Sequence, residues 1–252
     1  MVQVGKYYAG TSGLVLPVPN KSYYPQAFQD KSRLTYYGSL FNSLEVNSSF
    51  YKMPNAKTLV KWDGEVPANF KFTYKLLKDV THNKQLLFNA DDVGRFMAVI
   101  NQSSKRGSLL IQLPPSTAVS TIGQLDALLA AVQVHNTQGN WDVAVEFRNN
   151  SWYLKETYEL LNNYGATMVL HDMPASLSPI VSFDAGFIYL RFHGPTGNYR
   201  GGYEDDFLYE YAGYITDWLA DGKTVYTYFN NTAGDAVHNL ITLNKYVTDL
   251  SG

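Results

Sequence analysis

An α/β fold, built as a single (β/α)8 barrel of the TIM type over residues 1–252, is the architecture that this sequence predicts. Three observations lead to it. Short apolar runs alternate with helical segments along the whole chain, as expected of parallel strands joined by helices. Most of these runs end in charged or amide residues. No linker, repeat or block of charge divides the chain, which favours one domain.

Eight apolar runs are expected to form the strands of this barrel. They begin at Tyr7 and then cover residues 44–48, 70–75, 109–113, 142–147, 166–170, 187–192 and 224–229. The first strand runs into a turn at 10–13 that does not match the G-x-G-x-x-G pattern of a Rossmann sheet. Pro114-Pro115 ends the fourth strand, because proline cannot continue a ladder. Several short strands alternating with helices favour a closed barrel over an open sheet.

The segments between the strands show helical spacing or helix-boundary residues. The expected helices cover residues 30–41, 54–62, 91–105, 122–135, 205–219 and 234–247, with another that begins at Ser151-Trp152. Pro54 opens one helix, Ser151 is expected to cap another, and Gly107 is expected to stop the helix over 91–105. Val80–His82 and the glycine- and tyrosine-rich segment 194–202 are expected to be loops.

Composition limits the classes of protein that this chain can belong to. Hydrophobic residues make up 45% and charged residues 17% of the chain, and the net charge of −2 offers no overall attraction for nucleic acid. The absence of cysteine excludes disulfides, thiolate metal sites and cysteine nucleophiles. No apolar stretch approaches the length of a membrane span, and the first residues lack a signal peptide pattern. The sequence therefore predicts a cytoplasmic protein that does not interact with membranes.

Polar residues at the ends of the strands are the candidate functional residues, because the carboxyl ends of barrel strands form the ligand-binding rim. Three acids and one histidine are the candidate catalytic residues, as groups that can move protons: Glu45, Glu146, Asp172 and His193. The candidate substrate-binding residues offer cations, amides or aromatic rings: Asn47, Lys75, Gln112, Arg148, Trp152, Arg191, Tyr199, Tyr228, Asn230 and Asn231. The cations among them suit a carboxylate or phosphate.

Three other interpretations of the same residues stay open. Glu146 and Arg148 lie two apart on one strand, so they can instead form a structural ion pair with each other or with Arg191. Carboxylates together with His171 and His193 have the chemistry of a divalent metal site, but no diagnostic ligand spacing is present. A lysine at a strand end, here Lys75, can also form a Schiff base. No cofactor is predicted, and a divalent metal is the minority alternative.

Six segments of the chain resemble one known family. They are Gly10-Thr11-Ser12-Gly13, 45–51, Gln112-Leu113-Pro114-Pro115, 146–148 with Ser151-Trp152, 191–194 and 228–231. In this order they are similar to the YecE-like family, catalogued as domain of unknown function seventy-two. The resemblance implies a TIM-type barrel and implies no reaction. Leu14-Val15-Leu16 stands where the family usually has an aromatic-rich stretch, so one wall of the pocket beside Ser12 is expected to differ.

The leading functional prediction is an enzyme that acts on a small anionic or polar metabolite at the mouth of the barrel, by hydrolysis or isomerisation. The alternatives are a non-catalytic module that binds a nucleotide or a nucleic-acid end, and a metal-dependent hydrolase. A low net charge disfavours long nucleic acids, which reward many phosphate contacts. The sequence does not decide between catalysis and binding alone, nor does it determine the oligomeric state.

Overall fold

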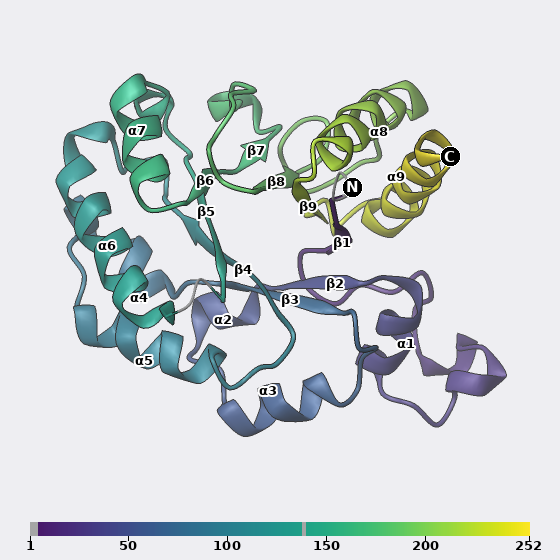
Figure 1. Ribbon diagram of the computed structural model, residues 1–252. Coiled ribbons are helices and arrows are strands. Elements are labelled where there is room, and N and C mark those ends of the chain that lie inside the picture. The colour runs from purple at the N-terminus through teal and green to yellow at the C-terminus, as the bar shows by residue number, and fades with distance from the viewer. Residues whose placement is uncertain (1–4, 138–139) are drawn as a thin grey trace.

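In the computed structural model, which describes residues 5–137 and 140–252, the strands lie at the centre and helices surround them (Figure 1). The described strands are β1 (Tyr7–Thr11), β2 (Ser43–Val46), β3 (Lys71–Lys75), β4 (Arg106–Gln112), β5 (Asp142–Glu146), β6 (Thr167–Met168), β7 (Leu170–His171), β8 (Phe187–Phe192) and β9 (Thr224–Phe229). The described α-helices are α1 (Arg33–Leu40), α2 (Ser48–Tyr51), α3 (Ala56–Asp63), α4 (Lys78–Thr81), α5 (Ala90–Ile100), α6 (Ile122–His135), α7 (Lys155–Asn163), α8 (Asp205–Ala220) and α9 (Ala236–Ser251). Short 3-10 turns lie between them, including one at Asn150–Trp152.

All strand pairs are parallel, which confirms the predicted α/β fold. The described strands do not form one continuous ladder of eight. They form a sheet in the order β1-β9-β8-β7 and a second in the order β2-β3-β4-β5-β6. The expected sixth strand is divided at Val169, whose N–H donates to the Val145 carbonyl at 2.9 Å. Because of this interruption, β6 pairs with β5 while β7 pairs with β8.

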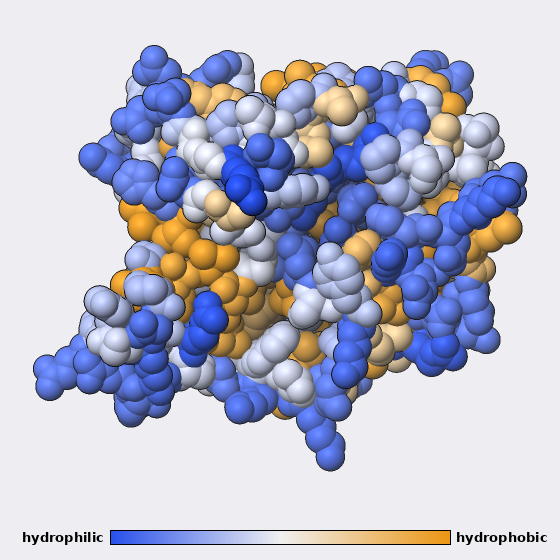
Figure 2. Space-filling model, turned by 180° about the vertical axis from the view of Figure 1, so that it is seen from behind, coloured by the Kyte–Doolittle hydropathy of each residue, from blue (hydrophilic) through white to orange (hydrophobic). Residues whose placement is uncertain are grey.

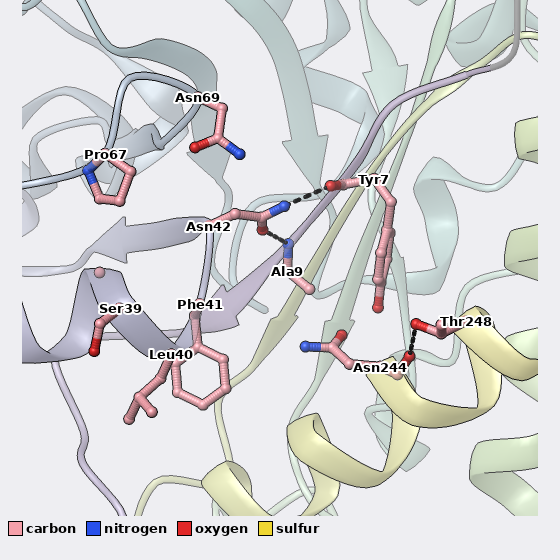
Figure 3. Close-up of a pocket in the computed structure, with 11 residues that line it drawn as sticks. Tyr7, Ala9, Ser39, Leu40, Phe41, Asn42, Pro67, Asn69, Asn244 and Thr248 are labelled. Atoms are coloured by element: carbon pink, nitrogen blue, oxygen red, sulfur yellow. Dashed lines mark hydrogen bonds between the residues drawn. The ribbon is translucent and has the colours of Figure 1, made fainter.

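The first strands of the two sheets lie side by side. Gly13 N–H donates to the Glu45 carbonyl at 2.8 Å, and Ser12 bridges to Glu45. Gly10 permits this approach, because a Cβ there would lie 2.0 Å from the Ser43 carbonyl oxygen. At the other end of β1, the Asn42 amide accepts from Ala9 N–H and donates to the Tyr7 carbonyl, both at 2.8 Å (Figure 3). These contacts bring Ser12 and Glu45 to the same rim.

Several predicted boundaries differ from the structure. Helix α5 ends at Ile100, and Gly107 lies inside β4 instead of stopping the helix. Glycine is needed at 107 for strand packing, because a Cβ there would lie 2.9 Å from the Phe72 carbonyl. Ser151 does not cap α7: its hydroxyl accepts from Val119 N–H at 3.0 Å, and the helix begins at Lys155. The predicted loop at Val80–His82 is mostly helix α4.

A layer of hydroxyl groups crosses the interior beneath the rim. Tyr228 OH lies 2.6 Å from Ser43 Oγ and 2.8 Å from Thr73 Oγ1, and all three side chains are buried. Tyr37 OH accepts from Thr11 N–H at 2.8 Å and donates to the Ser43 carbonyl at 3.0 Å. Tyr37 and Tyr228 therefore satisfy their hydroxyls within the fold, as most buried polar groups do.

The surface opposite to the view of Figure 1 is mostly hydrophilic, with an apolar area on the side of α1 and α9 (Figure 2). Leu40 of α1 and Ile241 and Leu250 of α9 are the large apolar side chains exposed on these two helices, at 40%, 49% and 39%. Within the described part of the chain, no helix has the length and apolar character needed to span a bilayer.

Candidate functional site

The carboxylate of Glu45, near the end of β2, accepts hydrogen bonds from three side chains, two on β8 and one directly after β1. Arg191 Nε and NH2 donate to its two oxygens at 3.0 and 2.7 Å, a bidentate pair. Ser12 Oγ and Tyr189 OH donate at 2.6 and 2.5 Å. Glu45 and Arg191 are at most 1% exposed. A buried charge of this kind is tolerated only when its partners satisfy it, as they do here.

Glu146, at the end of β5, joins the same arginine to a second one. Its Oε2 accepts from Arg191 NH1 and its Oε1 from Arg148 Nε. Glu45, Arg191, Glu146 and Arg148 form a linked set that we call the ion-pair network. Its two carboxylates and two guanidinium groups balance in charge. The ion pair between Glu146 and Arg148, expected from the sequence as an alternative to a catalytic role, is present.

The electrostatics of the ion-pair network keep both carboxylates ionised. Burial alone raises the pKa of Glu45, but Arg191 and the donors Ser12 and Tyr189 bring it below its ordinary value. Burial also raises the pKa of Glu146, but the charges of Arg148 and Arg191 together hold this pKa well below its usual range. Burial lowers the pKa of Arg191, but the two carboxylates raise it by more, so the net shift is upward. This geometry favours a positioning role for Glu45 and Glu146, and their predicted acid–base role stays a prediction.

His193, two residues after Arg191, is held in one tautomer. Asp172 Oδ1 accepts from the His193 backbone N–H at 2.7 Å and lies 3.1 Å from Nδ1. The other ring nitrogen, Nε2, lies 2.8 Å from Arg148 NH2, which can only donate. The ring proton is therefore on Nδ1. Burial lowers the pKa of His193 to about 4, although the Asp172 hydrogen bond acts in the opposite direction, so the ring is neutral at pH 7.

Glu146, His171 and His193 offer ligand atoms within 4.8 Å of one another, the geometry of a metal site. The donor set does not suit a metal, because its atoms are already used. His171 Nε2 donates to the Phe147 carbonyl at 2.8 Å, and its Nδ1 accepts from Met173 N–H at 3.2 Å. Both oxygens of Glu146 and Nε2 of His193 accept from arginines. The cluster is therefore better described as part of a hydrogen-bonded network than as a metal centre.

Lys75, at the end of β3, is the cation on this rim that no carboxylate neutralises directly. Its Nζ donates to Gln112 Oε1 at 2.9 Å and lies 4.0 Å above the centre of the Phe50 ring. Gln112 is oriented in turn by donating to the Leu113 carbonyl at 2.9 Å. Burial, together with repulsion from Arg191, lowers the pKa of Lys75 to about 8. The ammonium group is thus fixed in place and titrates close to neutral pH.

The structure separates the remaining candidates into two groups. Trp152 and Tyr228 are fully buried: Trp152 stacks on Phe147 and donates to the Thr117 carbonyl at 2.7 Å, which makes it part of the core. Asn231 is buried as well, and its amide donates to the Gly201 carbonyl at 2.9 Å, which supports the long rim loop. These three side chains have fold contacts that account for their presence.

Three candidates are at least partly exposed. Tyr199, with a φ of +66° and 42% exposed, lies edge-on to His193 at 5.8 Å between ring centroids. Asn230 is partly exposed at the end of β9. Asn47 lines a cavity of about 260 Å³ with Leu14 and Trp62, so one residue of the stretch that departs from the family pattern contributes an apolar side chain there.

Two tyrosines of the site were not among the predicted residues. Tyr189 lies two residues before Arg191 on β8, so strand alternation places both on the same face. Tyr153 OH donates to the Ser176 carbonyl at 2.5 Å and lies 3.3 Å from His171 Nε2. The alternation of side chains along a strand is the signal that could have identified Tyr189 from the sequence. Nothing in the local sequence points to Tyr153, which reaches the site from the segment before α7.

A cavity of about 350 Å³ at the amino ends of β1 and β2 differs in character from the charged site at the carboxyl ends (Figure 3). Asn42 and Asn244 line it, and none of its lining residues carries a formal charge. Conserved chemistry is not expected at this end of parallel strands, which usually serves stability. The lining of this cavity therefore differs from the carboxyl ends of the strands, where Glu45, Glu146, Arg148 and Arg191 meet.

Comparisons with known proteins agree with this architecture. Two solved DUF72 family proteins superpose on nearly the whole chain. The protein of Enterococcus faecalis V583 has a TM-score of 0.78 and 19% identity and covers 96% of this chain and 95% of its own. The protein of Thermotoga maritima MSB8 has a TM-score of 0.74 and 23% identity and covers 96% of this chain and 99% of its own. At these identities the likeness concerns the fold.

Sequence relatives and a family model give the same result. The chain is 26% identical to the UPF0759 protein YunF of Bacillus subtilis, over 86% of this chain and 87% of the relative. It is 24% identical to the UPF0759 protein YecE of Escherichia coli K12 over 51% of this chain and 46% of the relative. The family model described as protein of unknown function DUF72 matches residues 8–250. The chain therefore belongs to the DUF72 family.

Proposed function

We propose that the two sheets close into one eight-stranded barrel formed by a single domain. The bond from Gly13 N–H to the Glu45 carbonyl supports closure at one seam, and the bond from Val169 N–H to the Val145 carbonyl supports it at the other. With β6 and β7 counted as one interrupted strand, each strand then has two neighbours. In such a barrel the ligand binds at the carboxyl ends of the strands.

The function that this geometry supports best is an enzyme acting on a small anionic metabolite at that rim. One observation carries the proposal: Lys75 is a positioned ammonium group with a pKa lowered to about 8, beside a charge-balanced network. Lowered lysine pKa values are typical of functional sites. Lys75 has donor protons left after its bond to Gln112, and Arg148 keeps NH1 without a hydrogen bond to any described residue. These two cations would hold the anion.

His193 and Lys75 are the proposed proton-transfer groups. His193 is neutral and oriented by Asp172, the arrangement that general-base histidines share. A substrate that displaces Arg148 NH2 from His193 Nε2 would meet an available lone pair. The ion-pair network would then serve to fix Arg148 and the Arg191–His193 segment. Hydrolysis and isomerisation are both compatible with one proton donor and one acceptor, and we propose no finer reaction.

Binding of inorganic phosphate and of small carboxylates tests this function directly. We expect Lys75→Met to lose most of the affinity in isothermal titration calorimetry, while Lys78→Met, an exposed neighbour three residues on, retains it. Affinity should fall as pH rises through about 8, because the ammonium form of Lys75 is lost there. Equal affinity of the two variants, or no pH dependence, would contradict the proposal. Turnover of a metabolite panel that disappears in His193→Ala would establish catalysis.

A non-catalytic nucleotide-binding module is the second candidate, and the exposed ring of Tyr199 beside His193 favours it. Aromatic side chains stack on bases with a useful gain in affinity. Nucleotide binding that Tyr199→Ala weakens, without turnover of any nucleotide, would support this candidate over an enzyme. A cytoplasmic location stays a prediction from the sequence.

A further inference from the structure

A further cavity, lined by Asp172 but not by His193, lies between α8 and the segments that follow β7 and β8. Its volume is about 610 Å³, within the range of sites for small organic ligands. We call it the aromatic groove; its lining residues are Asp172, Leu177, Ile180, Pro195, Gly202, Tyr203, Glu204, Phe207, Glu210, Tyr211 and Tyr214. Neither Lys75 nor any arginine lines it, so it is distinct from the proposed anion site, although Asp172 borders both the groove and His193.

One wall of the aromatic groove is a continuous stack of rings. Tyr203 and Phe207 stack at 4.7 Å with an interplanar angle of 15°, and Phe207 contacts Tyr211 at the same centroid distance. Phe207 and Tyr211 are four residues apart on α8, so helical spacing places both on the groove side. Ring faces carry negative potential and attract organic cations.

The charged residues that line the aromatic groove are all acidic. Glu204 and Glu210 are exposed at its edge, while the Asp172 side chain is 10% exposed at its inner end. Asp172 accepts from His193 backbone N–H, His193 Nδ1 and Tyr203 OH. A carboxylate has about four acceptor positions, so about one stays available. No lysine, arginine or histidine lies among the lining residues to neutralise this charge.

We propose that the aromatic groove binds a small organic cation, an ammonium group attached to an apolar body. The charge would lie between Asp172 and Glu210, and the body would lie on Phe207 and Tyr211. Leu177 and Ile180, which are 59% and 60% exposed, would cover its apolar part. An anion is disfavoured by the three carboxylates, and a neutral apolar ligand would leave the charge of the groove uncompensated. This site goes beyond the proposed function and does not depend on Lys75.

Three probes with the same ring and different charge test the proposal: benzyltrimethylammonium, benzyl alcohol and phenylacetate. We expect the cation to bind at least about tenfold more tightly than the alcohol in calorimetry, from cation–π and carboxylate attraction together. Phenylacetate should not bind in the groove. Equal binding of the three probes, or no heat and no rise in Tm with the cation at tens of millimolar, would overturn the proposal.

Variants locate the cation without disturbing the core. Glu210→Gln should weaken the binding of benzyltrimethylammonium by about three- to tenfold, because the substitution removes one nearby carboxylate and keeps the side-chain volume. Asp206→Asn is the matched control: it removes the same charge from an exposed position on α8 that does not line the groove. Phe207→Leu should weaken binding further. An equal effect of Glu210→Gln and Asp206→Asn would show only general charge attraction and refute a site. Lys75→Met should leave cation affinity unchanged, which separates this test from that of the anion site.

Discussion

The two ends of strand β5 carry carboxylates with opposite electrostatics. Glu146, at the carboxyl end, contacts two guanidinium groups, and its pKa is well below the usual range despite complete burial. Asp142, at the amino end, accepts from Tyr226 OH at 2.8 Å, and burial raises its pKa although Tyr226 and Lys71 act in the opposite direction. The same chemical group on one strand is therefore strongly ionised at one end and resists ionisation at the other.

The difference shows that burial does not by itself decide the charge state; the cations in contact with the carboxylate do. The amino end has hydroxyl partners, and the carboxyl end has guanidinium partners. Replacing a buried ion pair with apolar residues is often neutral or stabilising, so stability alone does not explain such a network. Its location at the ligand-binding end of the strands favours a role in positioning Arg148 and His193.

The largest expected effect comes from removing the shared cation. Arg191→Met leaves Glu45 and Glu146 with an uncompensated buried charge, and we expect a loss of about 5 kcal/mol in the free energy of unfolding. Urea denaturation at pH 7 measures it. Arg95→Met removes an exposed ion pair with Asp92 and should cost less than about 1 kcal/mol. Similar losses in the two variants would mean that the ion-pair network is no different from a surface pair.

Neutralising each carboxylate of β5 tests the comparison most directly. Glu146→Gln should cost about 3 kcal/mol at pH 7, because two arginines lose a charged partner. Asp142→Asn should change stability by less than about 1 kcal/mol, since the folded state already disfavours its ionised form and Tyr226 can still donate to the amide oxygen. Equal costs for the two substitutions would break the contrast between the ends.

The pH dependence of these two variants has opposite signs. The folded pKa of Glu146 is below its unfolded value, so its stabilisation is present above the ordinary pKa of 4.5 and is lost as pH falls through the folded value. The difference in the free energy of unfolding between wild type and Glu146→Gln should therefore shrink in acid. Asp142 has a raised folded pKa, so it opposes folding as pH rises above its ordinary value of 3.8. The stability of Asp142→Asn relative to wild type should thus increase as pH rises. Thermal unfolding measured at several pH values would detect this change.

An effect smaller than those of Arg191→Met and Glu146→Gln is expected at the hydroxyl partner of the amino end. Tyr226→Phe removes the donor to Asp142 and should cost about 1 to 2 kcal/mol. The double variant with Asp142→Asn should cost less than the sum of the single changes, because the two side chains share one interaction. Additive costs would mean that the Tyr226 hydroxyl and the Asp142 side chain are not energetically coupled, which would contradict a stabilising hydrogen bond between them.

The sequence predicted the class of fold and the charged end of the strands for a clear physical reason. Glu45, Glu146, Arg148 and Arg191 each interrupt or end an apolar run, and charged residues are rarely buried without a shared partner. The spacing of Glu146 and Arg148 indicated their ion pair, but the pairing of Glu45 with Arg191 was not predictable. Arg191 reaches Glu45 across 146 positions in the sequence, and that contact depends on how non-adjacent strands face one another.

Aromatic residues and interruptions in strands were the main limits of prediction. Trp152 and Tyr228 were expected to bind ligand but are buried in the core, because a pocket wall and a core use the same residue types. The break at Val169 leaves no mark in the apolar run Ala166–Leu170, since the strand changes partner without changing residue type. The aromatic groove was missed because its rings belong to a helix pattern that looks like ordinary core spacing.

Asp172 has a further consequence because its carboxylate borders two compartments at once. Its Oδ1 fixes the Nδ1 proton of His193, and its side chain also lines the aromatic groove. A cation that enters the groove draws on the same negative charge that holds this proton. By thermodynamic reciprocity, whatever groove occupancy does to the basicity of His193, protonation of His193 must do to groove affinity. The shared carboxylate of Asp172 thus links the aromatic groove to His193, and the coupling is measurable as a shift of the histidine titration with added cation.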